Sequence, residues 1–253
     1  MKDESRLPDL TITDIDTTMV RVPLEKVYKG SHYRMTHRST IITRITTKSG
    51  IVGEAYAGDE DGGLEDINAI IRNEIAPKVL GMDGFAIEKV WQTSRPATWD
   101  ILRDRRLGLV ATACVDVALW DAIGKALGTP LWKLWGGYRN EIPVITIGGY
   151  YSEDADITAE VTDLVERGFA GMKFKIGGLT PEEDIARVRE ARAAGGEGFA
   201  LAVDANQGWS PTEAIRFSRM AEDLNLLWFE EPCHWQNDRR SMREVRSRGP
   251  VPV

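Results

Sequence analysis

The sequence predicts an α+β segment followed by an α/β segment in which parallel strands alternate with helices. After about residue 141, short apolar runs alternate with helical patterns, and 31 positions separate Lys173 from Asp204 while 26 separate Asp204 from Glu230. Before that point, strand-like runs follow one another without a helix between them. Alternating units build either a doubly wound sheet or a (β/α)8 barrel. No glycine-rich dinucleotide fingerprint follows any of the runs, which disfavours the doubly wound Rossmann fold.

The α+β segment begins with a predicted three-stranded sheet. The runs rich in Thr, Ile and Val are 10–22, 39–47 and 51–57, and Ser49-Gly50 between the last two is typical of a hairpin turn. Residues 23–38 are long, polar and aromatic, so we expect a functional loop there.

Helical periodicity follows in the same segment. Apolar residues fall on one helix face at Leu64, Ile67, Ile70, Ile71 and Ile75. Further helices are predicted at 85–94 and 107–127, and a short one at 131–137. The helix at 107–127 is apolar on most sides, so we expect it to be buried.

Four strand and helix pairs, and the start of a fifth strand, are predicted in the α/β segment. The strands are expected at 144–150, 171–177, 199–209, 226–232 and from 249, and the helices at 155–167, 180–196, 210–224 and 237–248. Thr180 before Pro181 predicts a helix N-cap, and Ser210 with Glu213 has the spacing of a capping box. Apolar, β-branched strands of this length are typical of a buried parallel sheet.

Composition excludes several classes of partner. The formal net charge of -7 argues against nucleic-acid binding, which needs a basic surface. No apolar run approaches the roughly 20 residues that span a bilayer, and the polar opening MKDESRLPDL lacks the apolar stretch of a signal peptide. Two cysteines do not form a disulfide framework. We therefore expect a cytoplasmic protein without nucleic-acid or membrane partners.

Charged residues gather at the predicted carboxyl ends of three consecutive strands. Lys173 and Lys175 are two positions apart and share one strand face, while Asp204 and Glu230 end the next two strands. Function in both candidate architectures sits at these strand ends. Two carboxylates that converge there suit a hard divalent cation, so Asp204 and Glu230 are candidate metal ligands.

The paired lysines have three possible roles. Beside a cation and a second ammonium, one lysine loses affinity for its proton and can act as a general base, while the other neutralises a substrate carboxylate. Alternatively, Lys173 and Lys175 form structural salt bridges with Asp204 and Glu230. A third possibility is a Schiff-base nucleophile, as in barrel aldolases, which does not need the acids as metal ligands.

These motifs in combination resemble the enolase superfamily, in its mandelate racemase and muconate lactonizing branch. The matching stretches are KFK at 173–175, VDANQGW at 203–209, WFEEP at 228–232 and ALWDAIGKALGTPLWKLWGG at 118–137. The resemblance implies an α+β capping domain at 1–140, with a three-stranded antiparallel sheet and helices. It implies that 141–253 form about the first half of a (β/α)8 TIM-like barrel.

The resemblance also implies roles for individual residues. Asp204 and Glu230 would be the first two of three Mg2+ ligands, and Lys175 the base that removes a proton α to a carboxylate. Lys173 would bind that carboxylate and stabilise the enediolate, and Asn206 would line the site. The segment 23–38, with His32, Arg34 and His37, would cover the barrel mouth and set substrate choice, with His32 a candidate substrate-binding residue. Glu231 receives no role.

The expected reaction is dehydration of a sugar acid. Racemisation, epimerisation or cycloisomerisation within the same superfamily is the alternative, and a catalytically inactive fragment or binding module is an alternative of a different class. The third acid would follow the fifth strand, beyond Val253. The second base would come from still later strands, and the full-length protein is expected to be a homo-oligomer.

Overall fold

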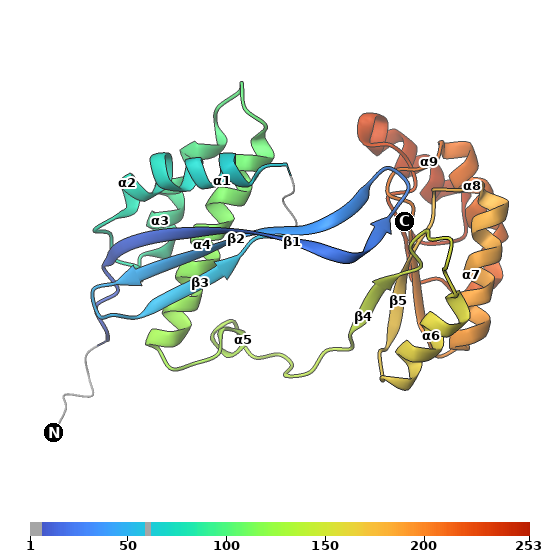
Figure 1. Ribbon diagram of the computed structural model, residues 1–253, viewed down its shortest axis with the longest axis horizontal. Coiled ribbons are helices and arrows are strands. Elements are labelled where there is room, and N and C mark those ends of the chain that lie inside the picture. The colour runs from blue at the N-terminus through green and yellow to red at the C-terminus, as the bar shows by residue number, and fades with distance from the viewer. Residues whose placement is uncertain (1–6, 59–61) are drawn as a thin grey trace. The chain divides into compact units, whose positions relative to one another are not determined.

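The computed structural model describes residues 7–58 and 62–253 (Figure 1). The chain forms two compact units. The first holds the chain up to Leu24 together with His37–Asn140, and the second holds Glu25–Thr36 and Glu141–Val253. The second unit therefore takes a short segment from the N-terminal half of the chain.

A three-stranded sheet in the order β1-β2-β3 forms one layer of the first unit. Its strands are β1 (Ile12–Lys29), β2 (Arg34–Thr47) and β3 (Val52–Tyr56). β2 and β3 pair antiparallel, with Ile42 opposite Tyr56, as the turn at Ser49-Gly50 predicts. Ile41 and Ile45 of β2 are fully buried beneath the helices.

The prediction of a loop over residues 23–38 is wrong. Both strands continue through this segment as a two-stranded ribbon (Figure 1), and only 30–33 form the turn, where the Gly30 N–H donates to the Tyr33 carbonyl at 3.2 Å. The outer half of β1 has no regular alternation of buried and exposed positions. A strand that is exposed to solvent on both faces lacks the period-two pattern by which strands are recognised.

The helices of the first unit cluster around one long helix, which packs on β3. They are α1 (Leu64–Ile70), a π-helical turn (Ile71–Ile75), α2 (Ala76–Val79), α3 (Ile87–Ser94), α4 (Arg105–Ala126) and α5 (Leu131–Leu134). The five apolar positions predicted to share one face are all buried.

Helix α4 is long and apolar enough to cross a membrane, but 56% of its apolar window is buried inside the protein. Ala111, Val115 and Leu119 are almost inaccessible and belong to the core of the first unit. The predicted burial of this helix is therefore confirmed, and α4 has the environment of a core helix.

The second unit is a parallel sheet in the order β4-β5-β6-β7 with helices between consecutive strands (Figure 1). The strands are β4 (Ile145–Gly148), β5 (Gly171–Lys175), β6 (Ala200–Asp204) and β7 (Phe229–Glu230). The helices are α6 (Ile157–Glu166), α7 (Pro181–Gly195), α8 (Pro211–Met220) and α9 (Asp238–Arg248). The predicted alternation of parallel strands and helices is confirmed.

The last residues do not form the strand predicted from 249. They lie beside β7, where the Phe229 N–H donates to the Pro252 carbonyl at 2.7 Å and the Val251 N–H donates to Ser218 Oγ at 3.1 Å. Pro250 and Pro252 have no N–H to donate, so a regular ladder cannot form through them.

Both predicted helix starts have the expected caps. The Thr180 hydroxyl accepts from the Glu183 N–H while the Glu183 carboxylate accepts from the Thr180 N–H, and Ser210 and Glu213 repeat the arrangement. Each box satisfies backbone donors that a helix N-terminus leaves unpaired. Helices α7 and α8 therefore begin at fixed points just beyond the ends of β5 and β6.

Gly177, just after β5, is expected to tolerate alanine poorly. It has a φ of +88°, and a Cβ atom there would lie 2.5 Å from the carbonyl oxygen of Ala205. Gly168 has a φ of +78° with nothing within 4 Å of the same position, so it is a matched control. We expect Gly168→Ala to lower the free energy of unfolding by about 1–2 kcal/mol. Gly177→Ala should cost a further 1–3 kcal/mol or so for the clash.

Urea denaturation of the two alanine variants measures this difference. Equal losses for Gly168→Ala and Gly177→Ala would show that the turn after β5 can move away from β6 at no cost.

Candidate active site

The site is built at the level carboxyl ends of β5, β6 and β7. In the parallel register, Lys175 lies beside Asp204, and Asp204 lies beside Glu230. Lys173, two positions before Lys175, projects from the same face of β5. Three strands thus place two ammonium groups and two carboxylates side by side.

The four charged groups are in direct contact. Lys175 Nζ lies 2.8 Å from Asp204 Oδ2, and Lys173 Nζ lies 3.0 Å from the same oxygen. Lys173 Nζ is also 2.8 Å from Glu230 Oε1. Asp204 is 1% exposed and Lys175 5% exposed, whereas the Glu230 side chain is 37% exposed, so the cluster is buried at its centre and reaches solvent at Glu230.

The charges in the cluster shift each other's protonation. Burial acts to lower the pKa of Lys173, but hydrogen bonds to Glu230 and Asp204 outweigh it, so this pKa lies above its usual value. Burial acts to raise the pKa of Asp204, but its hydrogen bond from Lys175 and the Asn206 backbone N–H together hold this pKa below its usual value. Without a further cation, the lysine charge and the aspartate charge stabilise each other.

Asn206 completes the cluster on the β6 side. Its Oδ1 accepts from Lys175 Nζ at 2.8 Å, and its backbone N–H donates to Asp204 Oδ1 at 2.9 Å. Asn206 and Gln207 have φ values of 42° and 67°, a left-handed conformation that asparagine adopts more readily than most residues. The turn therefore directs the Asn206 amide back toward the lysine.

Glu230 and Glu231 point to different partners. Glu230 Oε2 accepts from Trp228 Nε1 at 3.0 Å while Oε1 faces Lys173. Glu231 has a φ of 43° and accepts from Trp235 Nε1 at 3.2 Å. Glu230 therefore belongs to the ion cluster, whereas Glu231 faces an adjoining cavity.

The tip of the β1–β2 ribbon lies on the end of β6 within the second unit. Ser31 Oγ donates to the Ala205 carbonyl at 2.8 Å, and His32 Nε2 lies 3.3 Å from the Gln207 carbonyl. A cavity of ≈ 520 Å³ opens there, lined by His32, Tyr33, Asn206, Gln207, Glu231, His234 and Trp235. His32 thus lines the cavity that adjoins the ion cluster, whereas Arg34 is exposed and His37 falls in the first unit.

Two tyrosines next to the lysines were not predicted from the sequence. The ring centroid of Tyr33 lies 5.5 Å from Lys175 Nζ, and Tyr33 and Tyr150 share a side-chain hydrogen bond. Burial raises the pKa of Tyr33 and raises that of Tyr150 to about 12, so both hydroxyls stay protonated. Tyr150 could have been proposed, because it is the last residue of a predicted strand.

The acids suit a hard cation but provide only part of its coordination. Asp204 Oδ2 and Glu230 Oε1 both lie within 3.0 Å of one positively charged atom, Lys173 Nζ, so two carboxylates face a common point. Carboxylate oxygens are the ligands that Mg2+ prefers. Among residues 7–58 and 62–253, no group of three or more His, Cys, Asp or Glu side chains gathers as a metal site. The donors therefore fit two of the positions around such an ion.

Comparison with known proteins defines the family. Residues 12–136 match the family described as mandelate racemase / muconate lactonizing enzyme, N-terminal domain, and residues 156–253 match enolase C-terminal domain-like proteins. The chain belongs to the mandelate racemase and muconate lactonizing enzyme family of the enolase superfamily. Its fold is that family's N-terminal capping domain followed by part of its parallel α/β barrel.

Curated relatives of this family perform different reactions. A 3,6-anhydro-alpha-L-galactonate cycloisomerase from Streptomyces coelicolor is 34% identical over 87% of this chain and 62% of its own length. An arabinonate dehydratase from Saccharolobus solfataricus is 36% identical over 76% of this chain and 52% of its own. An L-Ala-D/L-Glu epimerase from Clostridium acetobutylicum is 35% identical over 88% and 62%. The chain thus spans between about half and two thirds of these relatives.

Solved structures agree with this assignment. A mandelate racemase/muconate lactonizing enzyme superimposes with a TM-score of 0.93 and 56% identity, over 96% of this chain and 67% of that one. A second such enzyme, from a marine actinobacterium and crystallised in complex with magnesium, gives a TM-score of 0.89 and 53% identity over 96% and 66%.

Proposed function

We propose that the protein to which this chain belongs removes a proton α to the carboxylate of a sugar acid and dehydrates it, with Mg2+ as cofactor. The observation that carries this proposal is the ion cluster of Lys173, Lys175, Asp204 and Glu230 at three adjacent strand ends. The magnesium-bound relative and the dehydratase support the metal and the reaction class.

Each residue of the cluster has a distinct role in this proposal. Asp204 and Glu230 would hold Mg2+, which when bound would polarise the substrate carboxylate and lower the barrier to proton removal. Lys175 accepts the α-proton at Nζ, directed by its hydrogen bond to Asn206 Oδ1. The Lys173 ammonium lies nearer Glu230, where it offsets the negative charge that the carboxylate gains as the proton leaves.

The cavity beside the cluster favours a hydroxylated substrate. His32, Asn206, Gln207 and Glu231 offer donors and acceptors, and Trp235 adds one apolar wall. Two of the relatives act on compounds named as sugar acids or their anhydro derivatives. The epimerase relative supports a second candidate, in which the proton returns to the other face of the α-carbon.

Isotope labelling separates these reactions. The purified protein is incubated in D2O with Mg2+ and a panel of aldonic and aldaric acids, and products are followed by NMR. Dehydration yields a 2-keto-3-deoxy acid with deuterium at C3, because the enol left by loss of water takes its proton from solvent. Epimerisation places deuterium on the α-carbon instead.

Removal of the metal tests the cofactor in the same assay. We expect EDTA to abolish turnover and added Mg2+ to restore it. Full activity after chelation contradicts the metal mechanism, and trapping of a substrate adduct with borohydride would indicate Schiff-base chemistry at a lysine. A chain that binds Mg2+ but shows no exchange with any acid would be a binding module or an inactive fragment.

We further infer a cytoplasmic protein that forms homo-oligomers at full length. The relatives include an anhydro-galactonate cycloisomerase and an arabinonate dehydratase, which act on small molecules, and the formal net charge of -7 disfavours a nucleic-acid partner. Sedimentation of the full-length protein measures the oligomeric state.

A further inference from the structure

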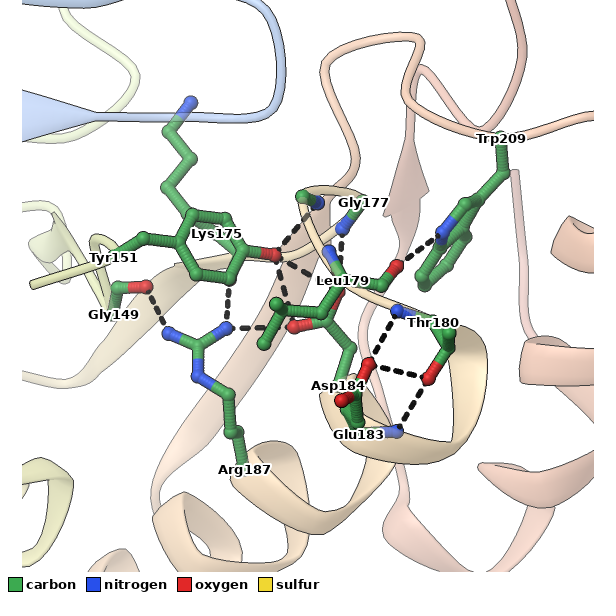
Figure 2. A network of polar contacts seen from close by, with 11 residues as sticks. Gly149, Tyr151, Lys175, Gly177, Leu179, Thr180, Glu183, Asp184, Arg187 and Trp209 are labelled. Carbon is green, nitrogen blue, oxygen red and sulfur yellow. Dashed lines mark hydrogen bonds and ion pairs between the residues drawn. The ribbon is translucent and has the colours of Figure 1, made fainter.

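A second buried charge lies behind the lysine strand, on helix α7. Asp184 is fully buried, and both of its carboxylate oxygens accept from Tyr151 Oη, at 2.9 and 2.8 Å (Figure 2). The Gly177 N–H donates to Asp184 Oδ2 at 2.8 Å. A carboxylate held this way binds the turn between β5 and α7 directly to the helix.

Arg187, one helical turn later, connects this carboxylate to both neighbouring strand ends. Its Nη1 donates to Asp184 Oδ1 at 2.7 Å and to the carbonyl of Lys175 at 3.1 Å, and its Nη2 donates to the carbonyl of Gly149 at 2.6 Å (Figure 2). The guanidinium also stacks over the Tyr151 ring, 4.3 Å from its centroid. Such planar, multiply bonded contacts fix geometry better than a single ion pair does.

Tyr151 closes the network from the β4 side. Besides donating to Asp184, its Oη accepts from the Gly178 N–H at 2.8 Å. Its neighbour Tyr150 hydrogen-bonds Tyr33 beside the lysines. Gly149 and Tyr151, which flank Tyr150, are therefore both bound to the network.

We propose that Asp184, Arg187 and Tyr151 form a clamp that positions Lys175 and Tyr150 for the reaction. Arg187 donates to the backbone carbonyl of Lys175, and the N–H groups of Gly177 and Gly178 donate to Asp184 and Tyr151. On the other side, Arg187 donates to the carbonyl of Gly149, so the residues before and after Tyr150 are both in the network. This inference rests on the proposed function in assigning Lys175 as the base. The clamp residues are positioning residues, because they touch the lysine backbone from behind and not its Nζ.

Lysine accessibility provides a test that needs neither substrate nor metal. The native 253-residue chain is acetylated briefly with a small amine-reactive acetyl donor. Modification of each lysine is then measured by peptide mass spectrometry. In Asp184→Asn we expect Lys175 to react about tenfold faster, the scale of losing one buried charged hydrogen-bond partner. Lys173 should change little, because strand pairing on both sides holds it. The milder Tyr151→Phe should raise Lys175 reactivity about threefold.

The matched control is Asp223→Asn, which removes an exposed ion pair between Asp223 and Arg189. Arg189 lies on α7, the helix that also carries Asp184. The control variant should leave the ratio of Lys175 to Lys173 modification unchanged. If Asp184→Asn and Tyr151→Phe raise the acetylation rates of Lys173 and Lys175 equally, or lower only the unfolding midpoint, the clamp serves stability alone and the proposal is overturned.

Kinetics of the active full-length enzyme add a readout that separates the two proposals. We expect Tyr151→Phe and Asp184→Asn to lower kcat by about 10- to 100-fold, as small misplacements of a reacting group do, with KM within twofold. A changed ratio of Lys175 to Lys173 modification, in a protein without metal-dependent turnover, would support the clamp and contradict the proposed reaction. Unchanged kcat in both variants would overturn the clamp.

Discussion

Lys175→Ala is expected to abolish exchange of solvent deuterium into the product, at C3 after dehydration or at the α-carbon after epimerisation, with a loss of about 10²- to 10⁴-fold, the usual contribution of a positioned general base. The cause is specific, because Lys175 Nζ is held by Asp204 and Asn206 and the alanine leaves no proton acceptor there. Mg2+ binding should persist, since Asp204 and Glu230 are intact. Exchange is measured by NMR in D2O, and metal binding by calorimetry.

Two further variants give this prediction its controls. Lys175→Arg keeps the positive charge but cannot act as a base near neutral pH, so it should be equally inactive. Lys78→Ala on α2 removes an exposed lysine of the first unit and should retain full exchange. Substantial exchange in Lys175→Ala would assign the base elsewhere and leave Lys175 as a structural ion-pair partner.

Asp204→Asn is expected to cost about 3–5 kcal/mol of folding stability, because it breaks a buried ion cluster and leaves ammonium groups without their shared carboxylate. The amide keeps the shape of the side chain, so packing is preserved and the lost charge dominates. The same variant should bind Mg2+ much more weakly than the parent chain. Urea denaturation without metal measures the first effect, and calorimetry the second.

The exposed ion pair of Arg189 and Asp223 again provides the comparison. Asp223→Asn should cost less than about 1 kcal/mol, as surface pairs do. The triple variant Lys173→Met, Lys175→Met and Asp204→Leu should recover much of the stability lost in Asp204→Asn, because apolar side chains remove the unpaired charges. A cost for Asp204→Asn as small as that for Asp223→Asn would mean that water enters the cluster and solvates the lysines.

The ion cluster was predictable because its geometry follows from two local rules. Side chains alternate along a strand, so Lys173 and Lys175 had to share a face. Carboxyl ends of adjacent parallel strands meet at one edge, so Asp204 and Glu230 had to lie beside them. Their assignment as metal ligands and base remains a prediction that the isotope and chelation experiments test.

The cavity and the clamp were not predictable by these rules. His32 and Gln207 are 175 positions apart, and nothing local indicates that a polar ribbon tip reaches the end of β6. Asp184 and Arg187 are three positions apart on a helix, a spacing that is typical of a solvated surface pair. Only the structure shows that this particular aspartate is buried and receives backbone donors from the preceding turn.

The assignment of residues 25–36 to the second unit limits how the protein can be divided. The chain leaves the first unit after Leu24 and enters the second. It returns to the first unit after Thr36 and enters the second unit again after Asn140. A gene fragment that begins at Glu141 would encode every lysine and carboxylate of the ion cluster but would lack His32 and Tyr33. Recombination at that boundary would exchange His32 and Tyr33 while leaving the ion cluster and the other residues that line the cavity in place. One wall of the cavity could therefore be inherited separately from the ion cluster, although both reside in one compact unit.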